Sequence, residues 1–418
     1  MARQLPELRA EYCALQALDL SLDLTRGKPS PQQLALSEQL LALPGLGKDH
    51  DASGIDVRNY GGVDGGLQIR RIFAELFGVP VDRFLALANG SLRLMHDSLM
   101  FAMLFGVPGS SQPWVREQGI KFICPVPGYD RHHGICEALG IEMITVPMLP
   151  TGPDADAIAA LVAQDPSIKG MWVVPTYSNP TGYTVTQEVA RQLVSMPTAA
   201  PDFRIMWDDA YALHHLKADV GDHAVSAKAL DLAQQAGNPD RVLLYASTSK
   251  VSFAGSGVAF FGASDANIAW MRTRQSVQTI GPDKINHLRH AMFFGSADGV
   301  REHMTKHREI MAPKFEAVSR VLGERLGGQS VARWTNPAGG YFVSLDVLPG
   351  TASRVVQLAA QAGVALTPAG ATFPYGHDPL DSNIRLAPSM PALADVEVAM
   401  GAVATCVLLA EAEAVSQG

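Results

Sequence analysis

The chain has 418 residues, of which 47% are hydrophobic and 18% are charged, a composition that predicts large buried cores and excludes a disordered chain. The formal net charge of −8 argues against nucleic acid or an anionic membrane surface as the main partner. No stretch approaches about eighteen consecutive apolar residues, and the start has no basic region followed by an apolar one, so we expect neither a membrane span nor a secretory signal. The four cysteines lack metal-ligand spacing and fit buried thiols in a reducing cytoplasm.

The N-terminal part, residues 1–53, carries little sheet signal, and we expect it to pack with the small domain or on a partner subunit. Residues 54–305 then alternate short apolar runs with helical patterns. This alternation predicts parallel crossover units and an α/β sheet in a large domain. The runs expected to form strands are 121–125, 141–146, 170–175, 203–209, 241–247 and 257–262.

The character of the sequence changes after about Gly299, where a long helical pattern begins and continues beyond residue 320. A strand-like run at 339–347, a helix-like segment at 352–362, short strands near 364–367 and 383–386, and a closing helix at 393–412 follow. This succession predicts a smaller α+β domain, which we assign to residues 306–418.

Polar segments occur where several of the predicted strands end, or shortly after that. Parallel strands bring their carboxyl ends to one edge of a sheet, so these segments are expected to converge there. They are Asn89–Leu92, which precedes a helix, Pro127–Tyr129, Asn179–Gly182, Asp208–Tyr211 and Ser247–Lys250.

Lys250 follows three small polar residues at a strand end, and Gly255-Ser256-Gly257 beyond it allow a ligand to approach the backbone closely. An arbitrary loop lysine is solvated. A lysine held near other cations or apolar surface has a lowered pKa and can form an imine. We interpret Lys250 as such an amine.

Asp208 and Tyr211 follow another strand. A carboxylate at a buried strand end needs a cationic partner, and a protonated pyridine nitrogen would be one. The alternative is a loop carboxylate or a helix cap. Tyr211 could donate a hydrogen bond to a phenolic oxygen, or it could be a core tyrosine.

Gly90, Ser91 and Leu92 lie where a helix is predicted to begin, and free backbone N–H groups with the helix dipole favour a phosphate there. An ordinary serine cap explains the same residues about equally well. Asn179 could donate a hydrogen bond to a ring oxygen, and Tyr129 could stack on a ring, although a packing aromatic is the simpler interpretation of Tyr129 alone.

Arg385 lies inside an apolar strand-like run, where a half-buried arginine needs an anion. A bidentate clamp on a substrate carboxylate would supply one, and so would a structural ion pair. The pairs His132-His133 and His214-His215 lack a convincing set of partner ligands, so we predict no metal and interpret them as polar or packing residues.

Taken in order, these motifs resemble the fold-type I aminotransferases, which depend on pyridoxal 5′-phosphate (PLP). The matching set spans nearly the whole chain: Gly90-Ser91, Asn179–Gly182, Asp208-x-Ala210-Tyr211, Ser247-x-Ser249-Lys250 and Asn383-x-Arg385-Leu386. The segments Leu24–Pro29 and Asn59–Gly62 are similar to the type Ic branch of bacterial aspartate aminotransferases. The resemblance implies an α/β PLP-dependent transferase fold (type I), with a mostly parallel seven-stranded sheet in the large domain and a smaller α+β domain.

The resemblance also implies roles for the residues. Lys250 would carry PLP as a Schiff base and shuttle a proton, Asp208 would pair with the pyridinium nitrogen, and both would be catalytic together with Tyr211. Cofactor binding would extend to a further set: Gly90, Ser91, Leu92, Tyr129, Asn179, Ser247, Ser249, Ser256 and Tyr60. Tyr60 would reach the phosphate of the neighbouring subunit, which implies a homodimer. The substrate carboxylate would lie near Gly27 and Asn179 and be held by Arg385.

One position departs from the family pattern. Many relatives carry a phosphate-binding arginine about eight residues after the lysine, whereas this chain has Val258. Ser256 and backbone N–H groups are expected to replace part of that contact. The cation for a distal substrate carboxylate is left open among Arg26, Lys28, Arg274, Lys284 and Arg289.

The function that we predict is aspartate:2-oxoglutarate transamination by a ping-pong mechanism on amino acids and 2-oxo acids. An aminotransferase for another amino acid, or a fold-type I PLP lyase, would use the same cofactor contacts. A non-catalytic, effector-binding domain is a remoter alternative, because no DNA-binding pattern precedes the large domain.

Overall fold

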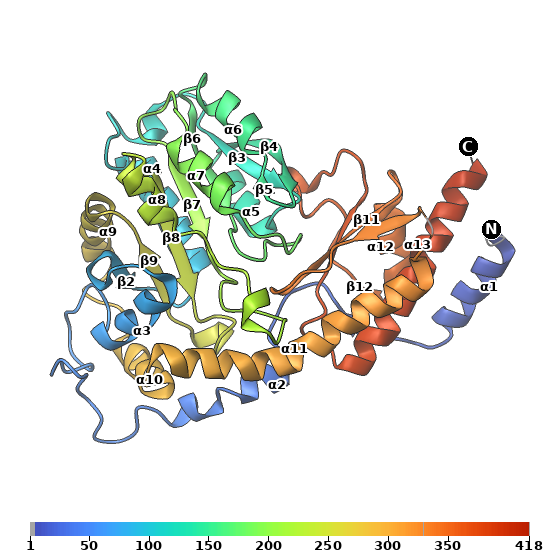
Figure 1. The fold of residues 1–418 in the computed structure, drawn as a ribbon, viewed down its shortest axis with the longest axis horizontal. Helices are drawn as coiled ribbons and strands as arrows, with labels where there is room; N and C mark the ends of the chain where they lie inside the picture. Colours follow the sequence, from blue (N-terminus) through green and yellow to red (C-terminus); the bar gives the residue numbers. More distant parts are fainter. Residues whose placement is uncertain (1–4, 329, 418) are drawn as a thin grey trace.

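The computed structural model describes residues 5–328 and 330–417, and Figure 1 shows a large sheet at one end of the molecule and a small sheet at the other. The large sheet has the strand order β2-β9-β8-β7-β6-β3-β4-β5. Neighbours from β8 to β4 run parallel, whereas β9 is antiparallel to both of its neighbours and β5 is antiparallel to β4. The strands are β2 Phe84–Ala86, β3 Lys121–Val126, β4 Glu142–Leu149, β5 Gly152–Pro153, β6 Ile168–Val173, β7 Arg204–Asp208, β8 Val242–Ser247 and β9 Ala259–Gly262.

The expected seven strands are therefore present, and the two-residue β5 adds an eighth at one edge. The edge strand β2 has no counterpart among the predicted runs, because its three residues are too few to show a pattern. The central strands are buried along their whole length, as in β7 and β6. Their near-continuous apolar sequences suit strands that are covered on both faces.

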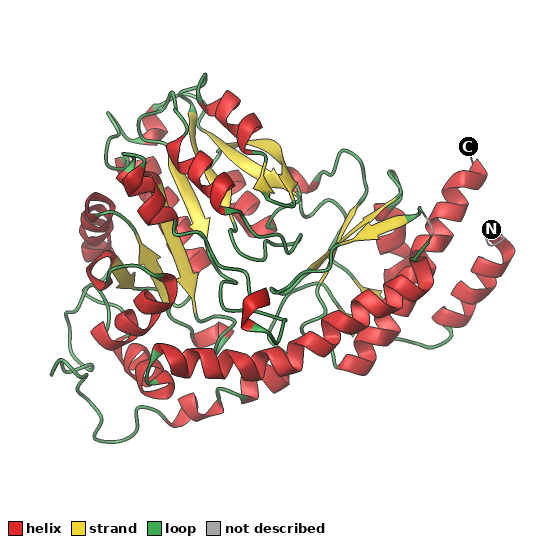
Figure 2. Ribbon diagram, in the orientation of Figure 1, coloured by secondary structure: helices red, strands yellow, loops and turns green. Residues whose placement is uncertain are grey.

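Helices cover both faces of the large sheet, as Figure 2 shows. Adjacent strand residues belong to different cores: Ile205 packs with helices α3 and α7, and Met206 packs with α4. Several of these helices begin at a side chain that accepts a backbone N–H, such as Asp154, Thr186 and Ser264. The helices are α3 Leu67–Phe77, α4 Ser91–Phe105, α5 Asp130–Ala138, α6 Ala155–Val162, α7 Gln187–Ser195, α8 Ala229–Gln235, α9 Asp265–Gln278 and α10 Lys284–Phe294.

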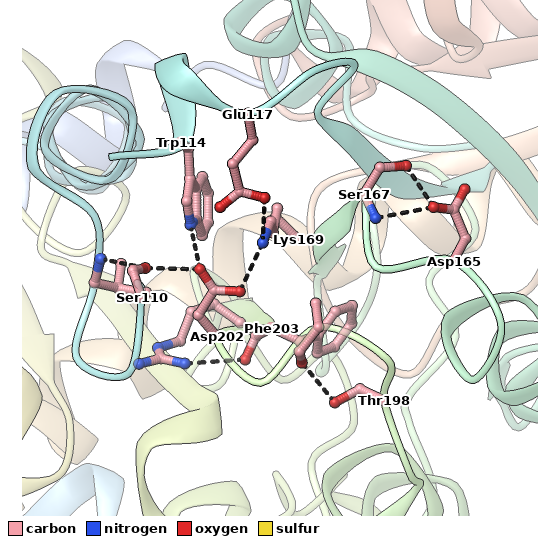
Figure 3. A network of polar contacts seen from close by, with 12 residues as sticks. Ser110, Trp114, Glu117, Asp165, Ser167, Lys169, Thr198, Asp202 and Phe203 are labelled. Atoms are coloured by element: carbon pink, nitrogen blue, oxygen red, sulfur yellow. Dashed lines mark hydrogen bonds and ion pairs between the residues drawn. The ribbon is translucent and has the colours of Figure 1, made fainter. Parts of the chain in front are cut away.

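A buried polar network holds the amino ends of the strands (Figure 3). Asp202, just before β7, accepts hydrogen bonds from Ser110 Oγ at 2.7 Å, Trp114 Nε1 at 2.8 Å and Lys169 Nζ at 2.9 Å. Lys169 also pairs with Glu117 at 2.7 Å. Burial by itself would raise the pKa of Asp202, but the three hydrogen bonds and Lys169 together lower it. Asp202 and Lys169 are therefore satisfied by internal partners and need no ligand.

The second part of the fold is built on an antiparallel sheet of three strands, with a two-stranded parallel sheet beside it. Its elements are β10 Ala332–Trp334, β11 Val343–Val347 and β13 Asn383–Leu386, the pair β1 Leu22–Asp23 and β12 Val364–Ala365, and the helices α1 Leu5–Gln16, α2 Pro31–Ala35, α11 Ala297–Leu326, α12 Ala352–Gln361 and α13 Leu393–Gln417. Helix α1 packs against α13, and both helices lie at the end of the molecule that holds the small sheet (Figure 1).

Helix α11 extends from the large sheet to the small one (Figure 1). Val300 and Met304, near its start, join the core of the large sheet, whereas Phe315 and Leu322 join the core around the small sheet. The predicted boundary between residues 305 and 306 falls inside this helix, and the domain limits stay predictions. Residues 1–4, 329 and 418 of those predicted domains lie outside the described residues.

Helix α13 is the one described helix that is long and apolar enough to cross a membrane. In its most apolar window, 67% of the residues are buried inside the protein. Val396, Met400 and Val403 are fully covered, and α13 packs against α11, α12 and α1. These contacts are those of a core helix.

Candidate active site

A cavity of about 160 Å³ opens at the carboxyl ends of the parallel strands. It is lined from four strand ends and from the first turn of α4, because parallel strands deliver their following loops to one edge. The lining residues are Gly90, Ser91, Leu92, Met95, Tyr129, Val174, Asn179, Asp208, Ala210, Tyr211, Ser247, Ser249 and Lys250. Ten of the twelve predicted cofactor residues therefore meet here, and Ser256 and Tyr60 are the two that do not line the cavity.

Lys250 follows β8 and projects into this cavity among aromatic rings. Its Nζ lies 4.8 Å from the centroid of the Tyr211 ring and 6.0 Å from that of Tyr341. Burial lowers the pKa of Lys250, and the negative charge of Asp208 partly opposes that effect. An amine in this setting reaches its neutral, nucleophilic form more readily than a solvated lysine does.

Asp208 ends β7 and is held from one side only. Its Oδ2 accepts a hydrogen bond from His132 Nε2 at 3.0 Å, and the His132 ring stacks on Trp172 at 4.3 Å between centroids. Its Oδ1 is buried and has no partner in the described part of the chain. A buried carboxylate oxygen without a donor is costly, so this atom points to a ligand that carries a proton or a positive charge.

His132 belongs to the site, although its sequence context predicted only a polar or packing residue. It contacts Asp208 and packs edge-on against Tyr129 at 4.9 Å. Tyr129 is the N-cap of α5 and His132 lies in the first turn of that helix, but no local sequence signal marks the contact of His132 with Asp208. The ring of His133 lies instead beside Gly128, with Nε2 3.2 Å from the place of a Cβ there, and burial lowers the pKa of His133 to about 4.

Arg385, on β13 of the small sheet, reaches the rim of the cavity. Its Nη1 donates to Asp130 Oδ1 at 2.8 Å and to Asn179 Oδ1 at 3.4 Å, and the Phe342 ring lies 5.0 Å from its Cζ. Arg385 Nε and Asn179 Nδ2 are both buried without a partner among the described residues. The arginine therefore makes an internal ion pair and still keeps a donor for a further anion.

Gly27 lies behind this arginine. A Cβ atom at Gly27 would stand 2.5 Å from Phe342 Cζ, closer than side chains pack. Only glycine leaves the ring where it is, and the ring supports Arg385. Gly27 and Arg385 thus lie against the same ring, that of Phe342. Its predicted contact with substrate stays a prediction.

The opposite end of the cavity is made of small polar groups and a helix start. Gly90 precedes α4 with extended backbone and no side-chain cap, and Ser249 Oγ lies 3.7 Å from the place of a Cβ on Gly90. Ser247 Oγ donates to Ser249 Oγ at 3.1 Å. Two hydroxyls beside the start of a 15-residue helix make a setting that suits an anion.

Tyr60 and Ser256 lie outside the cavity lining. Tyr60 is 81% exposed and borders a separate hollow beside Lys284, whose Nζ donates to the Tyr60 carbonyl at 3.2 Å. Ser256 precedes Gly257, which packs on the turn before α4. The hydroxyl of Ser256 accepts a hydrogen bond from Arg289. The roles predicted for Tyr60 and Ser256 stay predictions.

The unsatisfied atoms test whether PLP suits this cavity. Asp208 Oδ1 would accept from a protonated ring nitrogen, Asn179 Nδ2 would donate to a ring oxygen, Lys250 would meet an aldehyde, and the start of α4 would meet a phosphate. Each group of the cofactor thus has a matching protein group, and the residues fit it. In residues 5–328 and 330–417, no group of three or more His, Cys, Asp or Glu side chains could hold a metal ion.

A larger cavity, of about 580 Å³, lies between α3, α8 and α11. It contains none of the predicted site residues. Asp209 borders it and accepts from Ser226 Oγ at 2.5 Å, and burial raises the pKa of Asp209 to about 6. Asp209 and Asp208 therefore face different cavities, and Asp208 is the one in the candidate site.

Comparison with known proteins gives a consistent result. The family model described as aspartate amino-transferase matches residues 1–418. A protein of Mycolicibacterium smegmatis whose name places it among the aminotransferases is 56% identical over 96% of this chain and 94% of its own length. The aspartate aminotransferase of Corynebacterium glutamicum is 52% identical over 97% of this chain and 93% of its own length. A crystal structure of an aspartate transaminase from that organism superposes with a TM-score of 0.96 at 52% identity, covering 98% of this chain and 96% of the other.

Proposed function

Because this chain belongs to the aspartate aminotransferase family, we propose that it transfers the amino group of aspartate to 2-oxoglutarate by a ping-pong mechanism, with PLP as its cofactor. The observation that carries the proposal is the meeting of Lys250 with two buried, unsatisfied polar atoms, Asp208 Oδ1 and Asn179 Nδ2, in one cavity. The relative from Corynebacterium glutamicum supports the choice of aspartate.

Bound PLP supplies an electron sink for the charge that develops when the substrate loses its Cα proton. Asp208 would hold the proton on the ring nitrogen, and His132 keeps the Asp208 carboxylate turned towards the cavity through its hydrogen bond at 3.0 Å. Asn179 and Tyr211 would donate to the ring oxygen, and Tyr129 would cover a face of the ring.

Lys250 would both hold the cofactor and move the proton at the substrate Cα. Burial lowers the pKa of Lys250, which favours the neutral amine that a base requires. Burial also raises the pKa of Tyr211, with the charges of Tyr129 and Asp208 adding to the effect, so the phenol keeps its proton and remains a donor.

Arg385 would bind the α-carboxylate of the substrate and set the orientation of Cα. The contacts with Asp130, Asn179 and Phe342 hold the guanidinium in one orientation before substrate arrives. An arginine that is already fixed loses little entropy on binding, so more of the interaction energy remains for positioning.

Replacing Arg385 by lysine is expected to lower kcat/KM for aspartate by about 10²- to 10³-fold, mainly through KM. A lysine keeps the charge but cannot offer two parallel N–H donors. Steady-state kinetics over a range of aspartate concentrations measures the change. Asp130→Asn is the control, because it removes the internal ion pair and keeps the guanidinium, and we expect a loss of about tenfold or less. If Asp130→Asn lowers kcat/KM more than Arg385→Lys does, the main role of Arg385 is its ion pair with Asp130 and not the binding of substrate.

We also propose a homodimer in the cytoplasm, in which Tyr60 of one subunit reaches the phosphate of the other. Tyr60 is 81% exposed, and its loop is tied to α10 by Lys284, which donates to the carbonyls of Asn59 and Gly61 at 2.5 and 2.9 Å. A tyrosine that is presented outward on an anchored loop suits a contact with a second copy.

The test of the proposed function is a substrate panel read by absorbance. The purified protein, supplied with PLP, is mixed with aspartate, alanine, phenylalanine or leucine in the absence of any oxo acid. Aspartate is expected to change the visible cofactor band and to release one oxo acid per subunit. Added 2-oxoglutarate is expected to restore the original band. A faster response to another amino acid would overturn the aspartate assignment, and the absence of any cofactor band would overturn the PLP assignment.

A further inference from the structure

We propose that Arg289, on α10, is the cation that binds the cofactor phosphate, with Ser256 as the residue that anchors it. This inference rests on the proposed function, since it assumes that PLP occupies the cavity. Arg289 is one of the five cations that the sequence left open for a distal substrate carboxylate, and this inference gives it the phosphate instead.

Arg289 is a half-buried arginine whose contacts are all neutral. Its Nε donates to Asn286 Oδ1 at 2.6 Å, and its Nη2 donates to Ser256 Oγ. In the described part of the chain, no carboxylate forms an ion pair with it, and Nη1 has no acceptor there. A guanidinium carries five donors and a fixed charge, so this arrangement leaves donors and charge available for an anion.

Contacts of Gly257 and Asn286 place Ser256 beside the predicted phosphate end of the cavity, just outside its lining. A Cβ atom on Gly257 would lie 2.8 Å from the carbonyl oxygen of Asn89, in the turn that leads into α4, and 3.2 Å from Thr248 Oγ1. Asn286 donates to the carbonyls of Gly257 at 2.8 Å and Ser256 at 3.3 Å, which ties this segment to α10. The Ser256-Gly257 segment is therefore packed between the start of α4, the Ser247–Lys250 loop and the helix that carries Arg289.

The cavity itself lacks a cation for a phosphate. Lys250 is the one cationic side chain among its lining residues, and it is committed to the cofactor aldehyde. Val258 is fully buried in the protein interior and offers no charge. A phosphate monoester carries between one and two negative charges near neutral pH, which backbone N–H groups and hydroxyls compensate only in part. From the neighbouring helix α10, Arg289 contacts Ser256, whose segment packs on the start of α4.

The position of Arg289 also argues against a role on the substrate. Arg385 enters the site beside Asn179 and Phe342, on β13, whereas Arg289 contacts the segment that packs on the helix start. The two arginines thus approach from different elements, one beside the predicted substrate carboxylate and the other beside the predicted phosphate.

The test compares PLP with pyridoxal, which lacks the phosphate. Cofactor is removed from the full-length protein, and each ligand is titrated while tryptophan fluorescence is followed. Arg289→Gln is expected to raise the Kd of PLP by about 10- to 100-fold and to change that of pyridoxal by less than about twofold. The Kd of PLP for Arg289→Lys should lie between the values for the wild type and for Arg289→Gln. Ser256→Ala should raise the Kd of PLP by about three- to tenfold. Arg320→Gln, which removes an exposed charge on α11 that pairs with Glu397, is the matched control and should leave both constants unchanged.

The outcomes separate this inference from the proposed function. A wild-type protein that binds no PLP would overturn the proposed function itself. If the wild type binds PLP and Arg289→Gln weakens the binding of PLP and of pyridoxal equally, Arg289 supports the fold. This inference then fails. If PLP binding is unchanged and the KM for 2-oxoglutarate and aspartate rises, Arg289 binds a substrate carboxylate, which also overturns it.

Discussion

Replacing Lys250 by alanine is expected to lower the rate of transamination by about 10⁴-fold or more, because the change removes both the amine that would hold the cofactor and the base that would move the Cα proton. No other primary amine lines the cavity, so no neighbour can take over. The loss should appear in kcat, and the purified variant should lack the visible cofactor band of the wild type. Activity assays and absorbance spectra of the two proteins side by side measure both effects.

The fold should tolerate this substitution. The structural contacts of Lys250 run through its backbone, whose carbonyl accepts from His214 Nε2 at 3.3 Å and from Tyr341 OH at 3.5 Å. The melting temperature should therefore stay within a few degrees of the wild type. A small exogenous amine such as methylamine should restore part of the proton transfer, because the alanine leaves room at the position of Nζ. A variant that keeps more than about one hundredth of the wild-type rate would show that Lys250 is not the base.

Acidification from pH 7 to pH 5 is expected to destabilise the fold by several kcal/mol, through histidines that are buried in their neutral form. Burial lowers the pKa of six of them from 6.5 to values of about 3 or 4. They are His133, His214, His215, His287, His290 and His307. His290 illustrates the cause, since its Nδ1 donates to the carbonyl of Asn286 at 2.8 Å and its Nε2 must then accept from Ser252 Oγ at 2.9 Å.

The direction of the effect follows from proton binding. Below pH 6.5 the unfolded chain binds protons that the folded imidazoles exclude, so stability is fully present above about pH 6.5 and falls as the pH drops towards the folded values. At pH 5, a histidine whose pKa is lowered from 6.5 to about 4 costs about 2 kcal/mol. Asp209 acts in the opposite sense, because its pKa is raised to about 6 and its carboxylate takes up a proton more readily in the folded state than in the unfolded chain. This uptake offsets about 1 kcal/mol of the destabilisation at pH 5.

The six histidines all act in the same direction, so together they outweigh Asp209 and lower the stability by several kcal/mol at pH 5. Urea unfolding followed by tryptophan fluorescence at pH 8, 7, 6 and 5 measures the change. His290→Gln should reduce the slope of stability against pH by about one proton. A free energy of unfolding that is equal at pH 7 and pH 5 would contradict the prediction.

The amino-acid sequence by itself determined the central strands, the class of fold and most of the cavity lining. These features depend on local pattern: continuous apolar runs form strands that are covered on both faces, and the loops that come after parallel strands lie at one edge of the sheet. Three of the lining residues come after such a run, namely Lys250, Asp208 and Asn179, and the Gly90-Ser91 turn opens a helix. Their convergence could therefore be predicted without knowing how the helices pack.

The tertiary structure alone decided which residues support those groups. His132 meets Asp208 across 76 positions of sequence, and Arg385 meets Asp130 across 255. The approach of Arg289 to Ser256 depends on how α10 packs against the loop after β8. Such contacts are set by the distances between packed elements, which no local pattern encodes. A cation, a histidine or a glycine looks the same in sequence whether it faces solvent or supports a catalytic group, and only the packing of the elements around it separates the two.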